Sequence, residues 1–196
     1  MTRLVAILCT AVLASACGPP VTRGRQEYDP LEPVNRKIFW FNDRLDVYVL
    51  EPAARGWDWI APDRVQRSAS NFFVNLRFPI VTVNDLLQAK AKNGASDVGR
   101  FAVNTTFGVL GLFDPATDWG FEQHTEDFGQ TLGWWGVPPG PYLVLPLIGP
   151  SNPRDTVGLV ADSAAGVTSF FVDQFILLGA KVTETINYRS MVIEEI

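Results

Sequence analysis

The sequence predicts an all-α protein, and three observations support this class. Apolar residues recur every three or four positions in several segments, which is the period of a helix with one apolar face. Alternation of apolar and polar residues, the period of a strand, does not persist long enough to predict a sheet. From Leu112 to Arg154 the chain is dense in glycine and proline and has no helical period, so we expect an irregular segment there.

The first expected helix begins near Pro33, because proline is tolerated in the first helical turn. Its apolar face repeats at helical spacing through Ile38, Phe41, Leu45 and Val49. Pro52 lacks a backbone N–H, so we expect a kink or a break there, after which the pattern resumes through Trp57 and Ile60.

A second helix is expected to start at Pro62-Asp63, since an acidic residue is favourable near a helix N-terminus. Its apolar face comprises Val65, Ala69, Phe72, Phe73 and Leu76. We expect Pro79 to break this helix and a short apolar helix to cover Pro79 to Gln88.

Asn93-Gly94 is a turn signal, and Ser96 is a plausible N-cap for a helix from Asp97 to about Val109. Its shared apolar face comprises Val98, Phe101, Ala102 and Thr105, and Gly108 and Gly111 mark its end.

The segment from Leu112 to Arg154 carries aromatic residues that are costly to leave in water, so we expect it to be ordered and packed by its aromatic side chains. Three further helical patterns follow: Asp155 to about Gly166, Ser169 to Leu178, and Lys181 onward.

The first seventeen residues have the pattern of a bacterial secretory signal, with Arg3, a short apolar run and small residues before a cleavage site. Ser15-Ala16 directly before Cys17 resembles a lipobox, at which processing acylates the cysteine and cuts before it. We therefore expect a signal peptide over residues 1–16, a flexible tether over 17–32 and a helical domain over 33–196. Gly18, where an aspartate often retains lipoproteins in the inner membrane, favours the outer membrane. The alternative is a plain secretory signal with an incidental cysteine.

Composition excludes several kinds of partner and site. Removal of the signal, which holds one basic and no acidic residue, changes the formal charge from −5 to −6. An acidic chain is a poor match for nucleic acid or for anionic headgroups bound through a basic patch. With Cys9 in the signal and Cys17 acylated, no thiol remains for a disulfide. Since His124 is the single histidine, we expect no metal site and no cofactor.

Three blocks resemble one family. These are DPLEPVNR at Asp29–Arg36 with Phe41-Asn42, RFAVNTTFG at Arg100–Gly108 running on to Gly111–Asp114, and TEDFGQTLG at Thr125–Gly133. Together with the lipoprotein signal they resemble the MlaA family, also called VacJ, of outer-membrane lipoproteins that maintain lipid asymmetry.

The resemblance implies a ring of amphipathic helices in the inner leaflet of the outer membrane, around an amphipathic channel. It implies that mislocalised phospholipids pass from the outer leaflet to a soluble periplasmic carrier, MlaC, and that trimeric porins are associated. Family members continue past the last helix, whereas this sequence stops at Ile196 within a helical pattern, which suggests a truncated or short variant.

The candidate site residues are few. Besides the lipid attachment at Cys17, the pair Phe41 and Asn42 is a candidate for the channel wall, and the aromatic face of the first helix either meets lipid or the channel, or is ordinary core. We interpret His124 as a lone surface histidine.

Other polar and small residues have structural interpretations. Glycines 129, 133, 136 and 140 are expected to shape a loop, and Asp114 and Asp118 to be turn or cap residues.

Three functions remain open from the sequence. The favoured one is a non-enzymatic lipid channel. The alternatives are a structural lipoprotein that stabilises porins and an envelope lipid hydrolase, which would need an activated nucleophile.

Overall fold

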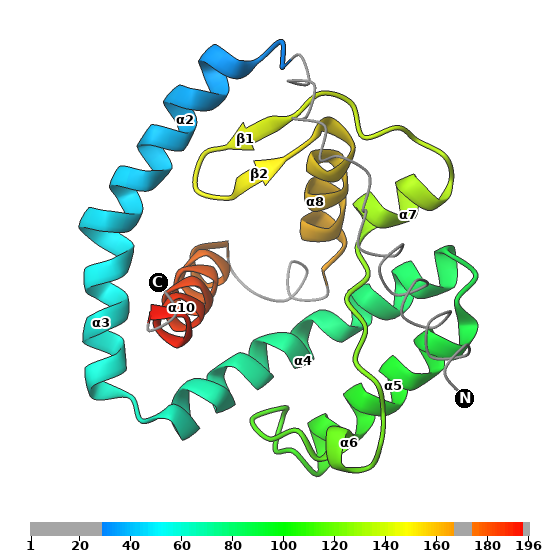
Figure 1. Ribbon diagram of the computed structural model, residues 1–196. Coiled ribbons are helices and arrows are strands. Elements are labelled where there is room, and N and C mark those ends of the chain that lie inside the picture. Colours follow the sequence, from blue (N-terminus) through cyan, green and yellow to red (C-terminus); the bar gives the residue numbers. More distant parts are fainter. Residues whose placement is uncertain (1–28, 167–173, 194–196) are drawn as a thin grey trace, which may run out of the picture. The chain divides into compact units, whose positions relative to one another are not determined.

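Helices make up most of the part of the chain that the structure describes, which confirms the all-α class. The structure is a computed structural model and describes residues 29–166 and 174–193 (Figure 1). The expected signal peptide, Cys17 and the first part of the helix expected from Ser169 lie outside these residues. Residues Leu31–Ile196 form a unit of their own.

The first expected helix is present as three consecutive elements, which we call the N-terminal rod: α2 (Glu32–Leu45), the π-helical turn η1 (Asp46–Leu50) and α3 (Glu51–Ile60). The irregularity expected at Pro52 takes the form of η1, where the Glu51 N–H bonds to the carbonyl of Asp46. Because Pro52 then falls in the first turn of α3, its missing N–H costs little and the chain stays helical.

Helix α4 (Asp63–Leu87) starts as expected, but it runs through Pro79 without a break. The predicted break is therefore wrong. A proline inside a helix costs about 3 kcal/mol. Helix α5 packs along α4, and Phe78 beside the proline is buried, which contributes about 2–3 kcal/mol. Packing against α5 thus offsets the local cost of Pro79. The sequence pattern shows only that cost, and a break was therefore predicted.

Helix α5 (Ala91–Thr106) begins before the expected start at Asp97. Asn93-Gly94 is consequently helical and Ser96 is not an N-cap, so both predictions are wrong. The chain reverses earlier, at Ala89, whose φ of 57° lies in the left-handed region. The helix ends at Thr106, shortly before the expected end near Val109, and Gly108 and Gly111 lie in the turns that follow it.

The glycine-rich segment is ordered, as expected, but it contains short elements that the sequence did not indicate. These are α6 (Pro115–Asp118), α7 (Phe128–Trp134), β1 (Leu143–Leu145) and β2 (Gly149–Ser151). The extended residues 121–127, which we call the strap, lead into α7. Packing by aromatic side chains is confirmed in part: Trp135 meets the Phe128 ring edge-to-face at 5.9 Å and Trp119 lies 5.3 Å from the Phe107 ring. Trp119, Trp134 and Trp135 are nevertheless each more than half exposed.

Two asparagines of α2 hold the β1–β2 hairpin. Asn35 donates to the Tyr142 carbonyl at 3.0 Å and accepts from the Val144 N–H at 2.9 Å. Two turns along the helix, Asn42 donates to the Leu145 carbonyl at 3.0 Å and accepts from the Leu147 N–H at 2.9 Å. Each side-chain amide therefore binds both a carbonyl and an N–H of the hairpin, as a neighbouring strand would.

The remaining helices close a circuit of contacts within residues 31–196. Helix α8 (Pro153–Ala165) confirms the expected helix from Asp155, and α10 (Gln174–Met191) confirms the one continuing past Lys181. The N-terminal rod contacts β1 at one end and α10 at the other, and α10 in turn contacts α4 (Figure 1). Helix α4 also contacts α5 and α7, and α7 contacts α8. This circuit is the ring of helices that the family resemblance implies.

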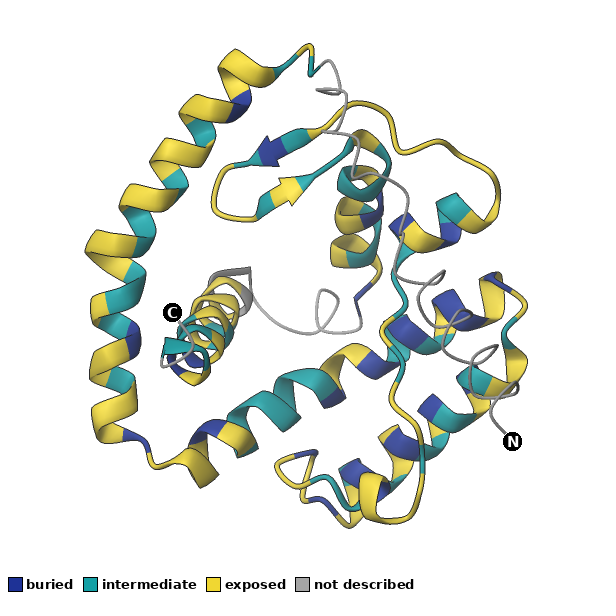
Figure 2. Ribbon diagram, viewed as in Figure 1, coloured by how far each residue is buried: buried dark blue, intermediate teal, exposed yellow. Residues whose placement is uncertain are grey.

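Few residues of this unit are fully buried (Figure 2), and most of the large ones among them are polar, which inverts the pattern of an ordinary soluble domain. Among the described residues the buried apolar side chains are Ala54, Ala61, Phe78, Val81, Ala116 and Val144. The buried polar or charged ones are more numerous: Asn35, Gln66, Asn75, Asn84, Asp85, Gln88, Asp97, Arg100, Asn104, Thr131, Asn187 and Ser190. Polar groups seldom occupy such positions without partners, so hydrogen bonds must hold the elements together.

Arg100, whose side chain is 2% exposed, makes four hydrogen bonds through its two terminal nitrogens. Its guanidinium donates to both carboxylate oxygens of Asp114 at 2.9 and 2.8 Å, and to the Phe121 carbonyl at 2.6 Å. Asn104 donates to the same carboxylate at 2.8 Å and accepts from the Ala116 N–H at 3.0 Å. One cation thereby joins α5, α6 and the strap.

A second polar cluster fixes the C-terminal helix. Asn187 of α10 donates to the Gln66 carbonyl on α4 and accepts from the Trp57 indole N–H, both at 3.0 Å. Ser190 donates to the Gln66 side chain at 2.7 Å, and Arg189 pairs with Asp46 of the rod at 3.0 Å. Helix α10 is thus joined to both neighbours through polar contacts.

We expect Arg100→Ala to lower the free energy of unfolding by about 3 kcal/mol, because it leaves the Asp114 carboxylate without its cation. Denaturant unfolding of the detergent-solubilised protein measures this loss.

Although burial raises the pKa of Asp114, hydrogen bonds from Thr117 and Asn104 and the charge of Arg100 lower it below its ordinary value. The stabilisation is therefore present at neutral pH and disappears as the pH falls below about 4. Arg67→Ala, on an exposed position of α4, should change stability by less than about 0.5 kcal/mol.

We expect Asn42→Ala to loosen the hairpin while α2 stays folded, because the variant loses both hydrogen bonds to the β1–β2 turn. Hydrogen–deuterium exchange at the Leu147 amide should rise by about tenfold or more, which corresponds to a loss of about 1.4 kcal/mol. Asp43→Ala, one position along the same helix and exposed, is the matched control. Equal protection of Leu147 in both variants would contradict the assignment.

Candidate functional site

The N-terminal rod exposes a series of large apolar side chains. Trp59 is 88% exposed, Tyr48 68% and Trp40 60%. Other exposed apolar residues of the rod are Val34, Phe39, Phe41, Val47, Val49 and Ile60. Of the two alternatives for this aromatic face, ordinary core burial is therefore wrong for these positions. Exposed apolar surface on this scale marks contact with a membrane or a partner.

The same inversion occurs on the other helices and loops. On α4 and α5 the expected apolar faces include Val65, Leu76 and Val98, which are all exposed. Beyond α5, Phe107, Leu110 and Phe113 are exposed, as are Leu147 and Ile148 at the hairpin turn. At these positions the helical periods that predicted the elements identify outer faces, whereas Phe72 and Phe73 of the same periodic face are half-buried.

No helix in the described ranges 29–166 and 174–193 combines the length and the apolar character needed to cross a membrane.

An open hollow of about 430 Å³ lies on the rod, lined by Arg36, Lys37, Trp40 and Phe41. Nearby, the Arg44 guanidinium lies 5.7 Å from the centre of a Trp40 ring and 6.0 Å from that of Tyr48. Basic side chains beside exposed aromatic rings are typical of a surface at the level of lipid headgroups.

The two channel-wall candidates do different things. Phe41 lines the hollow and is 46% exposed, so its ring is at the apolar surface. Asn42 uses both ends of its amide on the hairpin. Their role in a channel wall stays a prediction, and so does lipid attachment at Cys17, which lies outside the described residues.

The glycines of residues 129–140 were expected to shape a loop, which is wrong for Gly129 and Gly133 because both lie in α7. Gly136 and Gly140 have φ of 89° and 78°, values that favour glycine. A Cβ at Gly133 would lie 2.7 Å from Nη1 of Arg154, and one at Gly158 would collide with the backbone of Gly129. Helices α7 and α8 can therefore approach only because glycines occupy their interface.

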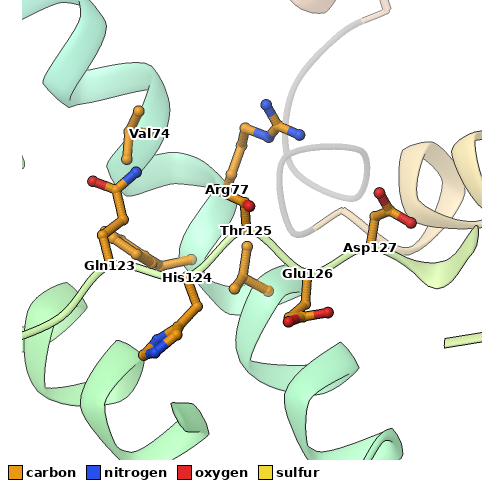
Figure 3. Close-up of a pocket in the computed structure, with 9 residues that line it drawn as sticks. Val74, Arg77, Gln123, His124, Thr125, Glu126 and Asp127 are labelled. Atoms are coloured by element: carbon orange, nitrogen blue, oxygen red, sulfur yellow. The ribbon is translucent and has the colours of Figure 1, made fainter. Parts of the chain in front are cut away.

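His124 is not the lone surface histidine that we expected. It belongs to the strap, beside a small pocket of about 90 Å³ lined by Val74, Arg77, Phe78, Val81 and residues 123–127 (Figure 3). Its side chain is only 18% exposed, and Nδ1 lies 3.2 Å from an oxygen of the buried Asp97. Its Nε2 lies 4.0 Å from Glu122. The expected structural role of Asp114 is confirmed, since it caps α6 by accepting from the Thr117 N–H.

The buried polar residues were missed in the sequence, although they leave a signal. Asp97, Arg100 and Asn104 recur at helical spacing, as do Asn84, Asp85 and Gln88. Such a polar stripe is ordinarily read as a solvated face. Here Thr131 of α7 donates to Asn84 at 2.8 Å and accepts from Gln88 at 3.1 Å, so the stripe on α4 faces the interior.

Comparison with known proteins identifies relatives along most of the chain. It is 40% identical over 167 residues to an uncharacterized protein of Rickettsia felis, covering 85% of this chain and 66% of that protein. It is 37% identical over 172 residues to the intermembrane phospholipid transport system lipoprotein MlaA of Escherichia coli, covering 86% and 68%. The corresponding protein of Haemophilus influenzae is 35% identical over 168 residues, with 83% and 67% covered. The chain thus spans just under two thirds of the length of the Rickettsia relative.

The fold has a solved counterpart. A structure described as the structural basis for maintenance of bacterial outer membrane lipid asymmetry superposes with a TM-score of 0.77 and 34% identity, over 86% of each chain. The family model for the MlaA lipoprotein matches residues 27–196. The chain therefore belongs to the MlaA lipoprotein family.

Proposed function

We propose that this protein is an outer-membrane lipoprotein channel that passes mislocalised phospholipids from the outer leaflet to a soluble periplasmic carrier, and so maintains lipid asymmetry. The observation that carries the proposal is the inverted polarity of the helical circuit, with polar groups buried and large apolar side chains exposed. Membership of the family and the transport role in the names of the Escherichia coli and Haemophilus influenzae relatives support it.

The exposed apolar surface suits helices that lie within one leaflet rather than across the bilayer. Trp40, Tyr48 and Trp59 would contact acyl chains, while Arg36, Lys37 and Arg44 reach headgroup phosphates from the same rod. We place this surface in the inner leaflet of the outer membrane, facing the periplasm.

The division of polarity also suits transport. A headgroup dragged through bare hydrocarbon costs several kcal/mol, because its charges lose their hydration. A polar-lined opening in the ring would spare the headgroup this cost while the acyl chains stay against apolar walls. Phe41 and Asn42 are our candidates for that wall. Net direction would come from the carrier.

Attachment to the membrane would have two components. Cys17 would carry acyl chains, and each buried CH₂ contributes about 0.8 kcal/mol. The exposed apolar faces of the helices would contribute the rest. The partners we propose are phospholipid, a trimeric porin and a carrier like MlaC, all from the family resemblance.

The hydrolase alternative is disfavoured by the surroundings of His124. Both of its ring nitrogens face carboxylates, Asp97 at 3.2 Å and Glu122 at 4.0 Å, rather than a hydroxyl nucleophile. The porin-stabilising alternative remains, and it predicts porin binding without movement of lipid.

Reconstitution tests the proposal. We expect the lipidated chain in liposomes to deliver labelled phospholipid to the purified soluble carrier, with no lysophospholipid formed. Liposomes without the chain are the control, and the Escherichia coli relative establishes that the carrier is active. Porin binding without transfer would support the structural lipoprotein, and lysophospholipid would support the hydrolase.

Removal of the anchor tests the two-component attachment. We expect Cys17→Ser to impair sorting to the outer membrane while the protein still sediments with membranes. Adding Trp59→Glu in this background should lower vesicle binding by about tenfold, or about 1.4 kcal/mol, whereas the exposed Arg55→Gln on the same helix should not. Full release of Cys17→Ser into the periplasm would argue against embedded helices.

A further inference from the structure

Two carboxylates are buried against each other between α4 and α5. Asp85 and Asp97 are both 0% exposed. Neither oxygen of Asp85 has a hydrogen-bond partner among the described residues, nor does Oδ2 of Asp97. Gly94 of α5 faces Asp85 across the helix interface, where a Cβ would make an ordinary contact at 3.4 Å from the Asp85 Cβ. The backbone N–H of Lys90 donates to the Asp85 carbonyl at 2.8 Å and fixes the turn.

Such a pair is stable only if it holds a proton. An ionised carboxylate accepts hydrogen bonds but cannot donate one, so two ionised groups in a closed space repel and stay unsatisfied. One shared proton supplies the donor and removes one charge. Burial raises the pKa of Asp85 to about 7, followed by the hydrogen bond that the shared proton makes with Asp97 and by the charge of Asp97.

The other charged groups around the pair come from the strap and from the turn between α4 and α5. Glu126 of the strap raises the pKa of Asp85 further and His124 opposes this. Glu126 is itself paired with Lys90 at 2.8 Å. On the α8 side, Asp162 is occupied by Asn84 at 3.1 Å and by the Phe128 N–H at 2.8 Å.

The strap is bound to α4 and α5 partly through this cluster. His124 meets Asp97, Glu126 meets Lys90, and the Glu122 carbonyl accepts from Ser96 at 3.1 Å. Residues 123–127 also line the small pocket with Arg77, whose side chain lies on the opposite side of the strap from the His124 ring (Figure 3). Two unscreened charges beneath the strap could be hydrated only if the strap moved away.

We propose that one proton shared by Asp85 and Asp97 latches the strap onto α4 and α5, and that loss of this proton as the pH rises releases it. The folded protein holds this proton more tightly than the unfolded chain does. Its contribution to stability is therefore complete below about pH 4, declines as the pH rises and is lost above about pH 7. The latch does not depend on the proposed transport function.

Hydrogen–deuterium exchange of the full chain in detergent tests the latch. After correction for intrinsic exchange rates, we expect strap amides to exchange about tenfold faster at pH 8 than at pH 5.5. At pH 8, one unit above the pKa of Asp85, the ionised form outnumbers the protonated form about ten to one, so the strap is mostly released. Asp85→Asn, whose amide donates to Asp97 at every pH, should keep the strap protected at pH 8. Asp118→Asn, exposed on α6, should behave as the unmodified protein does.

Infrared difference spectra give a readout that does not depend on how well a variant folds. The unmodified protein should lose a protonated carboxylic acid band between pH 5.5 and 8. Strap protection that is equal at both pH values, or the absence of that band, would overturn the proposal. Protection restored at pH 8 by added Ca²⁺ would also overturn it, in favour of a cation between the two carboxylates.

Discussion

The constraint on which this fold depends is that a polar group withdrawn from water must find a partner. An ordinary domain of this size would be held by apolar burial, yet here the side chains at the helix interfaces are mostly amides, carboxylates and a guanidinium. Arg100 joins three elements through Asp114 and the Phe121 carbonyl. Directional bonds thus fix the positions of helices that apolar contact would leave free to slide.

This arrangement explains why the sequence predicted the elements better than their faces. Apolar periodicity located the N-terminal rod, α4, α8 and α10, because an amphipathic helix has the same period wherever its apolar side points. Assigning that side to the core requires knowing that the surroundings are water. Val98 and Phe101 were therefore expected to share a packed face, whereas Asp97 and Arg100 on the other side form the interface.

The local errors have a common physical origin in packing between distant segments. Pro79 and the pair Asn93-Gly94 are sound signals of a break and a turn, but α4 and α5 pack against each other along these stretches. The hairpin was invisible because its strands are three residues each and are held by Asn35 and Asn42, over a hundred residues away. The motif around Phe41-Asn42 marked the right place without indicating this contact.

The inverted polarity also connects stability with the proposed transport. A ring that passes a headgroup must keep its shape, and here the polar groups buried between the helices are held by partners. Because those partners are protein atoms, the interior keeps its geometry without a lipid in place. Some buried polar atoms of the described residues still lack a partner, and three of them belong to the pair of Asp85 and Asp97, which only a proton completes. The proposed latch consequently lies at the least satisfied pair of the polar frame.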